Sequence, residues 1–331
     1  MKVKIFVAGA TGALGRRLVP ILVRAGYRVI GTTRVPTKAG TIRGAGAEAV
    51  VVDALNPDSV MQTIQAAKPD VVVHQLTAIP ARLDVRRFDR DFTMTNRLRT
   101  EGTDNLLRAA RAAGVRRFIA QSFAGWPYAR VGGPVKTEDD PLDPNPPAAL
   151  RRSMEAIRHL ESAVLGSGLE GLVLRYGGFY GPGTSIGEGG SILVDVRKRR
   201  FPVVGNGTGV WSFVHIDDAA QATLMAIERG QPGLYNIVDD DPAPVSDWLP
   251  ALATATAAKS PWRVPIFVGR LAVGEHGVVL MTQIRGASNA KAKRELVWKP
   301  RWASWREGFR YGLSDIRLKP DRAHEQASQA S

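Results

Sequence analysis

Three glycines placed directly after the first apolar run constrain this fold more than any other feature. The segment Ala8-Gly9-Ala10-Thr11-Gly12-Ala13-Leu14-Gly15 follows the strand-like residues 3–8 and opens a stretch with helical apolar spacing. Glycines let the main chain turn sharply, and they let an anion approach the backbone closely. A helix that begins here presents free N–H groups and a partial positive charge to that anion. The spacing G-x-x-G-x-x-G after a strand therefore predicts a loop that cradles a pyrophosphate.

The first half of the chain alternates strand-like and helix-like segments, which predicts a parallel sheet with helices on both faces. Its apolar runs are nearly unbroken, as a doubly buried sheet requires. Strands are expected at 3–8, 27–33, 50–52, 70–74, 117–121 and 171–175, and helices at 14–25, 59–67, 96–113 and 150–165. The expected fold class is therefore α/β, a doubly wound parallel sheet of the Rossmann type.

After residue 175 this rhythm breaks, and glycine and proline become frequent. The expected division is a dinucleotide-binding domain over 1–175, to which 211–238 return. A small C-terminal substrate lobe is expected over 176–210 and 239–313. The polar residues 314–331 are expected to form a flexible tail.

Composition excludes several kinds of site and partner. The chain has no cysteine, and its five histidines are far apart, so no metal site is expected. The net charge of +14 is spread along the chain with no nucleic-acid-binding motif beside it. No apolar run reaches the roughly 20 residues of a membrane helix. A cytoplasmic protein with a small-molecule substrate, and with neither nucleic acid nor membrane as partner, is expected.

Five segments in order resemble the short-chain dehydrogenase/reductase superfamily, in its extended or atypical branch with the NAD(P)-dependent epimerases and dehydratases. The first is the glycine loop, and the second is Val71-Val72-Val73-His74-Gln75-Leu76-Thr77-Ala78, similar to the family's fourth strand. The others are N-x-x-x-x-E-G-T-D-N-L-L-R-A-A-R-A-A-G over 96–114, L-R-Y-G-G-F-Y-G-P-G over 174–183 and W-S-F-V-H-I-D-D-A-A over 211–220. The resemblance specifies the fold, and it leaves the reaction open.

The resemblance implies a set of cofactor-binding positions on this chain. Asp53 resembles the family's adenine-contacting acid, although it equally suits a cap for the helix that follows. The full expected set is Gly9, Thr11, Gly12, Ala13, Leu14, Gly15, Arg34, Lys38, Asp53, Ala54, Gln75, Leu76, Thr77, Asn96, Arg158, Tyr176, Gly178 and Phe179.

The residues after the second expected strand favour NADP(H) over NAD(H). Enzymes that bind NAD commonly place a carboxylate there to hold the ribose hydroxyls. This chain has Gly31-Thr32-Thr33-Arg34-Val35-Pro36-Thr37-Lys38, without an acid. Arg34 and Lys38 suit charge-assisted hydrogen bonds to a 2′-phosphate. As an alternative, both are solvated surface cations.

The family's usual catalytic pair is missing. Its members use Tyr-x-x-x-Lys with a serine or threonine, and none of the six tyrosines here is followed by lysine four residues later. By position before the sixth expected strand, Ser153 or Met154 falls near the tyrosine and Ile157 or Arg158 near the lysine. Arg158 is able to keep the ribose contact that the lysine makes. Ordinary carbonyl reduction by the family mechanism is thereby in doubt.

Ser122, at the end of the fifth expected strand, resembles the family's catalytic serine. Tyr128 in the next loop and His159 on the altered helix are candidate replacement acids or bases, and Tyr180 is a third. His74 and His215 are interpreted as structural. Rings at Phe123, Trp126, Tyr128, Phe179 and Trp211 favour an apolar or planar substrate, and Arg82, Arg86 and Arg87 suit a carboxylate or phosphate.

The leading hypothesis is an NADP(H)-dependent oxidoreductase or epimerase/dehydratase-type enzyme that acts on a small organic substrate through a non-standard acid or base. Two alternatives stay open. One is a non-catalytic NAD(P)-binding regulator, and the other is an isomerase or cyclase without net redox change. Relatives often form homodimers, so the resemblance also implies that possibility for this chain.

Overall fold

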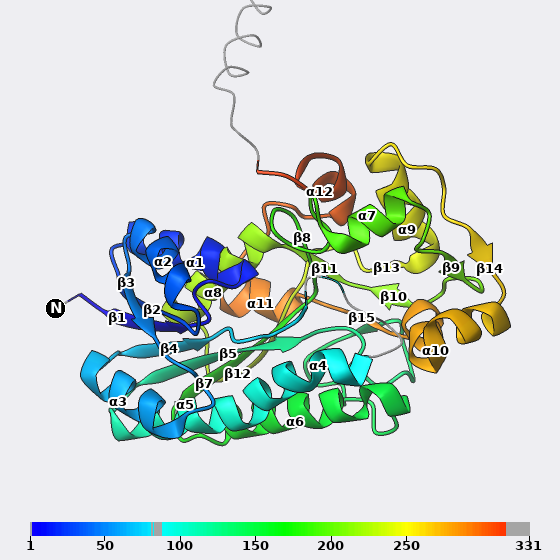
Figure 1. The fold of residues 1–331 in the computed structure, drawn as a ribbon. Coiled ribbons are helices and arrows are strands. Elements are labelled where there is room, and N and C mark those ends of the chain that lie inside the picture. Colours follow the sequence, from blue (N-terminus) through cyan, green and yellow to red (C-terminus); the bar gives the residue numbers. More distant parts are fainter. Residues whose placement is uncertain (1, 81, 83–87, 316–331) are drawn as a thin grey trace, which may run out of the picture.

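The computed structural model describes residues 2–80, 82 and 88–315. Seven parallel strands form one sheet in the order β12-β7-β5-β4-β1-β2-β3 (Figure 1). Their bounds are β1 Lys4–Ala8, β2 Arg28–Thr33, β3 Glu48–Val51, β4 Val71–His74, β5 Arg117–Phe123, β7 Glu170–Tyr176 and β12 Gly233–Ile237. The strand order reverses beside β1. The doubly wound α/β fold predicted from the sequence is confirmed.

Side chains alternate across this sheet, and helices bury both of its faces. Ile5 and Val7 of β1 join one apolar cluster, whereas Phe6 and Ala8 join the other. Figure 1 shows the two helical layers. One layer contains α1 Ala13–Arg24, α2 Ala39–Gly44 and α8 Ile216–Glu228, and the other contains α3 Pro57–Ala67, α4 Phe88–Arg97, α5 Thr103–Ala112 and α6 Arg151–Leu165.

The helix expected over 96–113 differs from the observed one. It begins earlier, at Phe88, because Phe88 and Phe92 stack on each other with 4.2 Å between ring centroids. A π-helical turn, η3 Leu98–Gly102, then separates α4 from α5. Such turns rotate the following side chains, and they occur often at functional sites. Here the turn places Arg99 in the interior, where it is only 7% exposed.

A second lobe packs on the carboxyl ends of the strands around its own aromatic core. Trp248, Trp305, Phe213 and Phe309 are almost fully buried there. Its elements are β8 Gly178–Tyr180, α7 Ser191–Arg197, β9 Val203–Val204, β10 Val210–Trp211, β11 Phe213–His215, β13 Ala243–Pro244, α9 Val245–Ala255, β14 Arg263–Val264, α10 Ile266–Thr282 and α12 Trp305–Tyr311. Short connecting elements are η1 Pro36–Lys38, β6 Val135–Lys136, η4 Ala148–Leu150, β15 Gly286–Ala287 and α11 Ala290–Glu295.

Neither a membrane-spanning helix nor a metal-holding cluster of side chains is found within the described residues. None of the helices within 2–80, 82 and 88–315 is long and apolar enough to cross a membrane. Over the same residues, no group of three or more histidine, aspartate or glutamate side chains is arranged to hold a metal ion. Arg86, Arg87 and the tail from 316 onward lie outside the described part of the chain.

Candidate functional site

The glycine loop makes a tight turn between β1 and α1. Gly9 has a φ of +94°, and a Cβ atom there would lie 2.8 Å from the carbonyl oxygen of Gln75. A Cβ at Gly15 would lie 2.3 Å from the carbonyl oxygen of Gly9. The loop therefore packs against the end of β4 and against the first turn of α1 with no room for side chains. Gly12 is the N-cap of α1, so the free N–H groups of this helix start at the loop.

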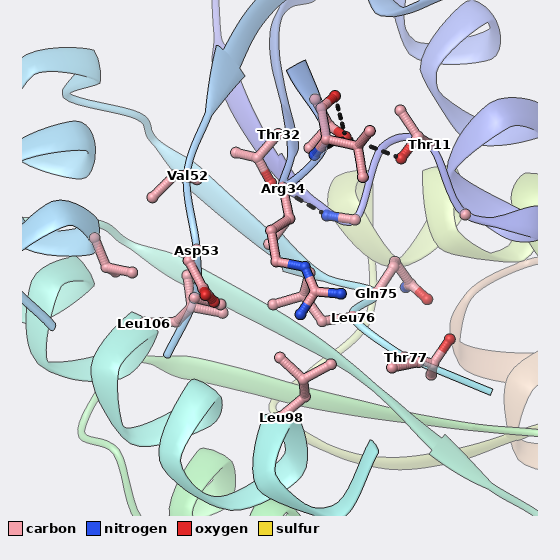
Figure 2. A pocket seen from close by; sticks show the side chains of 18 of the residues that line it. Thr11, Thr32, Arg34, Val52, Asp53, Gln75, Leu76, Thr77, Leu98 and Leu106 are labelled. Carbon is pink, nitrogen blue, oxygen red and sulfur yellow. Dashed lines mark hydrogen bonds between the residues drawn. The ribbon is translucent and has the colours of Figure 1, made fainter. Parts of the chain in front are cut away.

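A cavity of about 230 Å³ opens beside this loop, at the carboxyl ends of β1, β2 and β4 (Figure 2). Many of the residues predicted to bind the cofactor line it, namely Gly9, Thr11, Gly12, Arg34, Lys38, Asp53, Ala54, Gln75, Leu76 and Thr77. Other lining residues were not singled out in the sequence: Phe6, Ala8, Thr32, Thr33, Val35, Val52, Val60, Ala78, Leu98 and Leu106. The helical spacing of Leu98 and Leu106 was the available sign that both face the sheet.

Arg34 reaches from the end of β2 into this cavity, as Figure 2 shows. Within the described part of the chain, its guanidinium has neither a hydrogen-bond partner nor an ion-pair partner. Asp53 lies across the cavity, and its Oδ1 accepts a hydrogen bond of 3.0 Å from the N–H of Leu55. Asn56 caps α3 by accepting from the N–H of Ser59. Asp53 therefore stabilises a turn on the cavity wall. The residue that caps α3 is Asn56 and not Asp53.

A buried polar network lies behind the ends of β5 and β7. The Ser122 hydroxyl donates to Oε1 of Glu161 at 2.7 Å. Arg175 donates to both oxygens of the same carboxylate, at 2.8 Å from Nε and 2.6 Å from Nη2. Its Nη1 also donates to the Tyr128 hydroxyl at 3.0 Å, and that hydroxyl donates to Oδ1 of Asn236 at 2.6 Å. The structure therefore brings Ser122 and Tyr128 into one network through Glu161 and Arg175.

Burial sets the protonation of this network. Burial by itself would lower the pKa of Arg175, but the hydrogen bonds and charge of Glu161 raise it, so the guanidinium stays charged. Burial raises the pKa of the Tyr128 hydroxyl, which therefore holds its proton at neutral pH. Burial lowers the pKa of Arg99 to about 10, against the opposing charge of Glu161. The Glu161 carboxylate thus interacts with two buried guanidinium groups, those of Arg175 and Arg99.

The helix α6 carries no acid or base toward this network at the family's tyrosine and lysine positions. Ser153, Met154 and Ile157 are completely or almost completely buried, and the Ser153 hydroxyl accepts from Nδ2 of Asn96 at 3.1 Å. Arg158 donates to the carbonyl oxygen of Asp143, in the loop that precedes α6.

His159 lies elsewhere on α6. Its Nε2 is 2.8 Å from Oδ1 of Asp104 on α5, with both side chains about half exposed on the outer helical layer. The structure does not place it with Ser122 and Tyr128.

Two histidines and one tyrosine are buried and are engaged in internal hydrogen bonds or ring packing. The His74 ring lies 3.1 Å from the Thr103 hydroxyl and accepts from the N–H of Leu76, and burial lowers its pKa to about 4. His215 caps α8, and burial lowers its pKa. Tyr180 is buried against the rings of His215 and Phe309, and burial raises its pKa strongly.

The predicted aromatic residues divide into two groups. Phe123, the last residue of β5, and Trp126, just after it, are partly exposed, with 6.4 Å between their ring centroids. Phe179 is partly exposed beside Tyr176. Trp211 packs into the aromatic core of the second lobe, and Tyr128 is fully buried. Arg82 is paired with Asp195 of α7 at 3.3 Å.

Comparison with known proteins finds the same architecture. The model of the NAD dependent epimerase/dehydratase family matches residues 5–238. A 3-diazoavenalumate denitrifying reductase from a Streptomyces species is 41% identical over 316 residues, which are 92% of this chain and 99% of that protein. A UDP-glucose 4-epimerase from Thermotoga maritima, solved with UDP-glucose, superposes with a TM-score of 0.72 at 26% identity, covering 94% of this chain and 97% of that one. The Thermus thermophilus UDP-glucose 4-epimerase, solved with NAD, has the same TM-score at 25% identity, covering 94% and 98%.

Proposed function

The chain belongs to the NAD-dependent epimerase/dehydratase family, and from this premise we propose that it is an NADPH-dependent reductase that replaces a diazo group on an aromatic substrate with hydrogen. The observation that carries the proposal is the loss of the Tyr-x-x-x-Lys pair without a replacement acid in the described site. The relative with 41% identity supports it, because its name describes a denitrifying reductase of a diazo compound.

The residues of the cavity fit a dinucleotide. A Cβ atom at Gly9 or Gly15 would clash with the main chain, so glycine at both positions permits the tight turn onto which the N-terminus of α1 opens. Arg34 would hold the 2′-phosphate of NADPH, and because no partner occupies it among the described residues, its donors are available for that role. Thr77, Tyr176, Gly178 and Phe179 lie toward the nicotinamide end by family resemblance. The dinucleotide supplies a hydride when it is bound.

The chemistry explains why a proton donor is dispensable. Reduction of a carbonyl produces an alkoxide, which needs a proton from a well-placed acid. In an aryl diazonium ion, the ring carbon gains a hydride and loses its bond to nitrogen, whose bonding electrons leave with neutral N₂. The sum, ArN₂⁺ + H⁻ → ArH + N₂, balances atoms and charge without an acid. The Ser122 hydroxyl donates its hydrogen bond to Glu161, and the Tyr128 hydroxyl donates its hydrogen bond to Asn236, so both O–H groups are engaged inside the protein.

The chain's own residues then bind and orient the substrate. Phe123 and Trp126 at the end of β5, with Phe179 on β8, provide partly exposed rings against which an aromatic substrate packs. The network of Glu161, Arg175 and Ser122 holds the ends of β5 and β7 in register behind them. These side chains therefore have a positioning role in the proposal.

The test offers the enzyme two acceptors on the same carboxylated aromatic skeleton, a diazonium ion and an aldehyde. We expect NADPH oxidation and N₂ release, measured by absorbance and by mass spectrometry, with the diazonium ion only. Heat-inactivated protein corrects for direct reaction of the diazonium ion with NADPH. Reduction of the aldehyde without release of N₂ would contradict the proposal and indicate a displaced acid.

A further inference from the structure

A cluster of large apolar side chains stands exposed at the end of the second lobe. It comprises Trp262 at 57% exposure, Ile266 at 46%, Phe267 at 68%, Val268 at 37% and Leu271 at 82%. We call these five residues the apolar knob. Scattered exposed apolar residues are normal, but five within ten positions of the sequence form a local concentration of the kind that marks an interaction site.

Local packing explains why the side chains in the first half of α10 are exposed. Val264 of β14 pairs with Val204 of β9, and Gly269 lies so close to Val204 that a Cβ at Gly269 would be 2.4 Å from it. In the first half of α10, Gly269 is therefore the residue that packs directly against β9. Gly274, with a φ of +71°, then interrupts the helix. The first half of α10 lies at the end of the molecule opposite the N-terminus in Figure 1, and its residues 266–268 and 270–271 are exposed.

Basic residues lie in the two segments that precede β9 and β14. The residues just before β9 include Lys198, Arg199 and Arg200, and those just before β14 include Lys259. Because β9 and β14 are parallel neighbours, the two segments that precede them lie at the same end of this strand pair. The Arg199 guanidinium lies 3.8 Å from the centroid of the Trp262 ring, which joins the basic edge to the knob directly.

Further cations lie within the knob's own sequence. Arg263 and Arg270 are both exposed and alternate with the apolar residues. In the part of the chain that the structure describes, none of Arg263, Arg270, Lys198 and Arg200 forms an ion pair. Their charge is therefore available to an external anion.

We propose that the apolar knob and these cations form a docking surface for an anionic lipid bilayer. Protruding side chains with high exposure suit insertion into a fluid surface, whereas a folded protein partner would need a matching groove for each of them. A bilayer offers hydrocarbon directly beneath anionic headgroups, and exposed tryptophan favours that interface. The sequence predicted no membrane partner because it lacks a spanning segment, but docking at the surface requires none.

The test is sedimentation of the full chain with vesicles of phosphatidylcholine alone or mixed with phosphatidylglycerol. We expect binding to the mixed vesicles only. The Phe267→Asn/Leu271→Asn variant should weaken that binding by roughly tenfold or more, on the scale of one buried apolar side chain. Lys198→Gln/Arg200→Gln should weaken it by about twenty-five-fold, from about five-fold for each cation. Val131→Asn, at a position that is 70% exposed elsewhere, is the matched control and should bind as the parent does.

Three results would overturn the proposal. The first is the absence of binding to the mixed vesicles. The second is binding that persists unchanged in Phe267→Asn/Leu271→Asn, because the general positive charge would then account for it. The third is a dimer that light scattering detects without lipid and that this variant abolishes, because a second copy of the chain would then cover the knob. Circular dichroism of each variant confirms that the fold is kept.

Discussion

Removing the charge of Glu161 is the change that most directly tests the buried network. Glu161 is 5% exposed and Arg175 is 3% exposed. The carboxylate accepts three hydrogen bonds, one from Ser122 and two from Arg175. In Glu161→Gln, the guanidinium groups of Arg175 and Arg99 stay buried without a counter-charge. Breaking a buried pair by removing one partner costs roughly 3 to 5 kcal/mol, a large part of a typical folding free energy.

The assay is chemical denaturation in urea followed by circular dichroism, with the free energy of unfolding extrapolated to water. Glu101→Gln is the matched control, because Glu101 pairs with Arg97 through two bonds of 2.8 Å but on the surface. That change should alter the free energy of unfolding little. A double variant, Glu161→Leu/Arg175→Met, should recover part of the loss because no lone charge remains at that pair. If Glu161→Gln were as harmless as Glu101→Gln, the reasoning about the network would be refuted.

Three further predictions concern the cavity and its surroundings. Arg34→Ala should weaken NADPH binding by about 1.5 to 3 kcal/mol and NADH binding much less, as measured by fluorescence titration, since only NADPH carries the 2′-phosphate; equal losses would indicate stacking on adenine instead. Gly9→Ala should abolish nucleotide binding because its methyl would meet Gln75, whereas Gly26→Ala, with a φ of +89° and open space around it, should retain binding. The pKa of His74 lies below its unfolded value, so the unfolded chain binds the extra proton. Stability should fall by about 3 kcal/mol as the pH drops from 6.5 to 4, and His74→Asn should flatten that pH dependence of the unfolding free energy.

Much of the fold was predictable from periodicity because both faces of the sheet are buried. The sixth expected strand, 171–175, and the helix 150–165 lie within one residue of β7 and α6. The start of α4 was missed because charged residues at Asp89, Arg90 and Asp91 obscure the apolar spacing of Phe88 and Phe92. Both rings pack with Leu150 in one buried cluster, a tertiary contact that sequence spacing does not reveal.

The glycine loop and the wall residues of the cavity were predictable because they are local in sequence. The pairing of Glu161 with Arg175 was not, because one residue lies on an amphipathic helix and the other on the next strand. A sign was present: Arg175 ends an apolar run that is buried on both sides, and a charge in that place needs a partner. The position of His159 on the outer layer depended on which face of α6 meets the sheet, and this face was not resolved by spacing alone.

The most direct test of the proposed reaction follows the hydride. NADPH deuterated at the transferred position is supplied with the carboxylated aryl diazonium ion in ordinary water, and the product is examined by NMR and mass spectrometry. We expect one deuterium on the ring carbon that lost nitrogen, because the hydride goes there and no protein acid contributes. Protium at that carbon, with the deuterium absent from the product, would contradict the account.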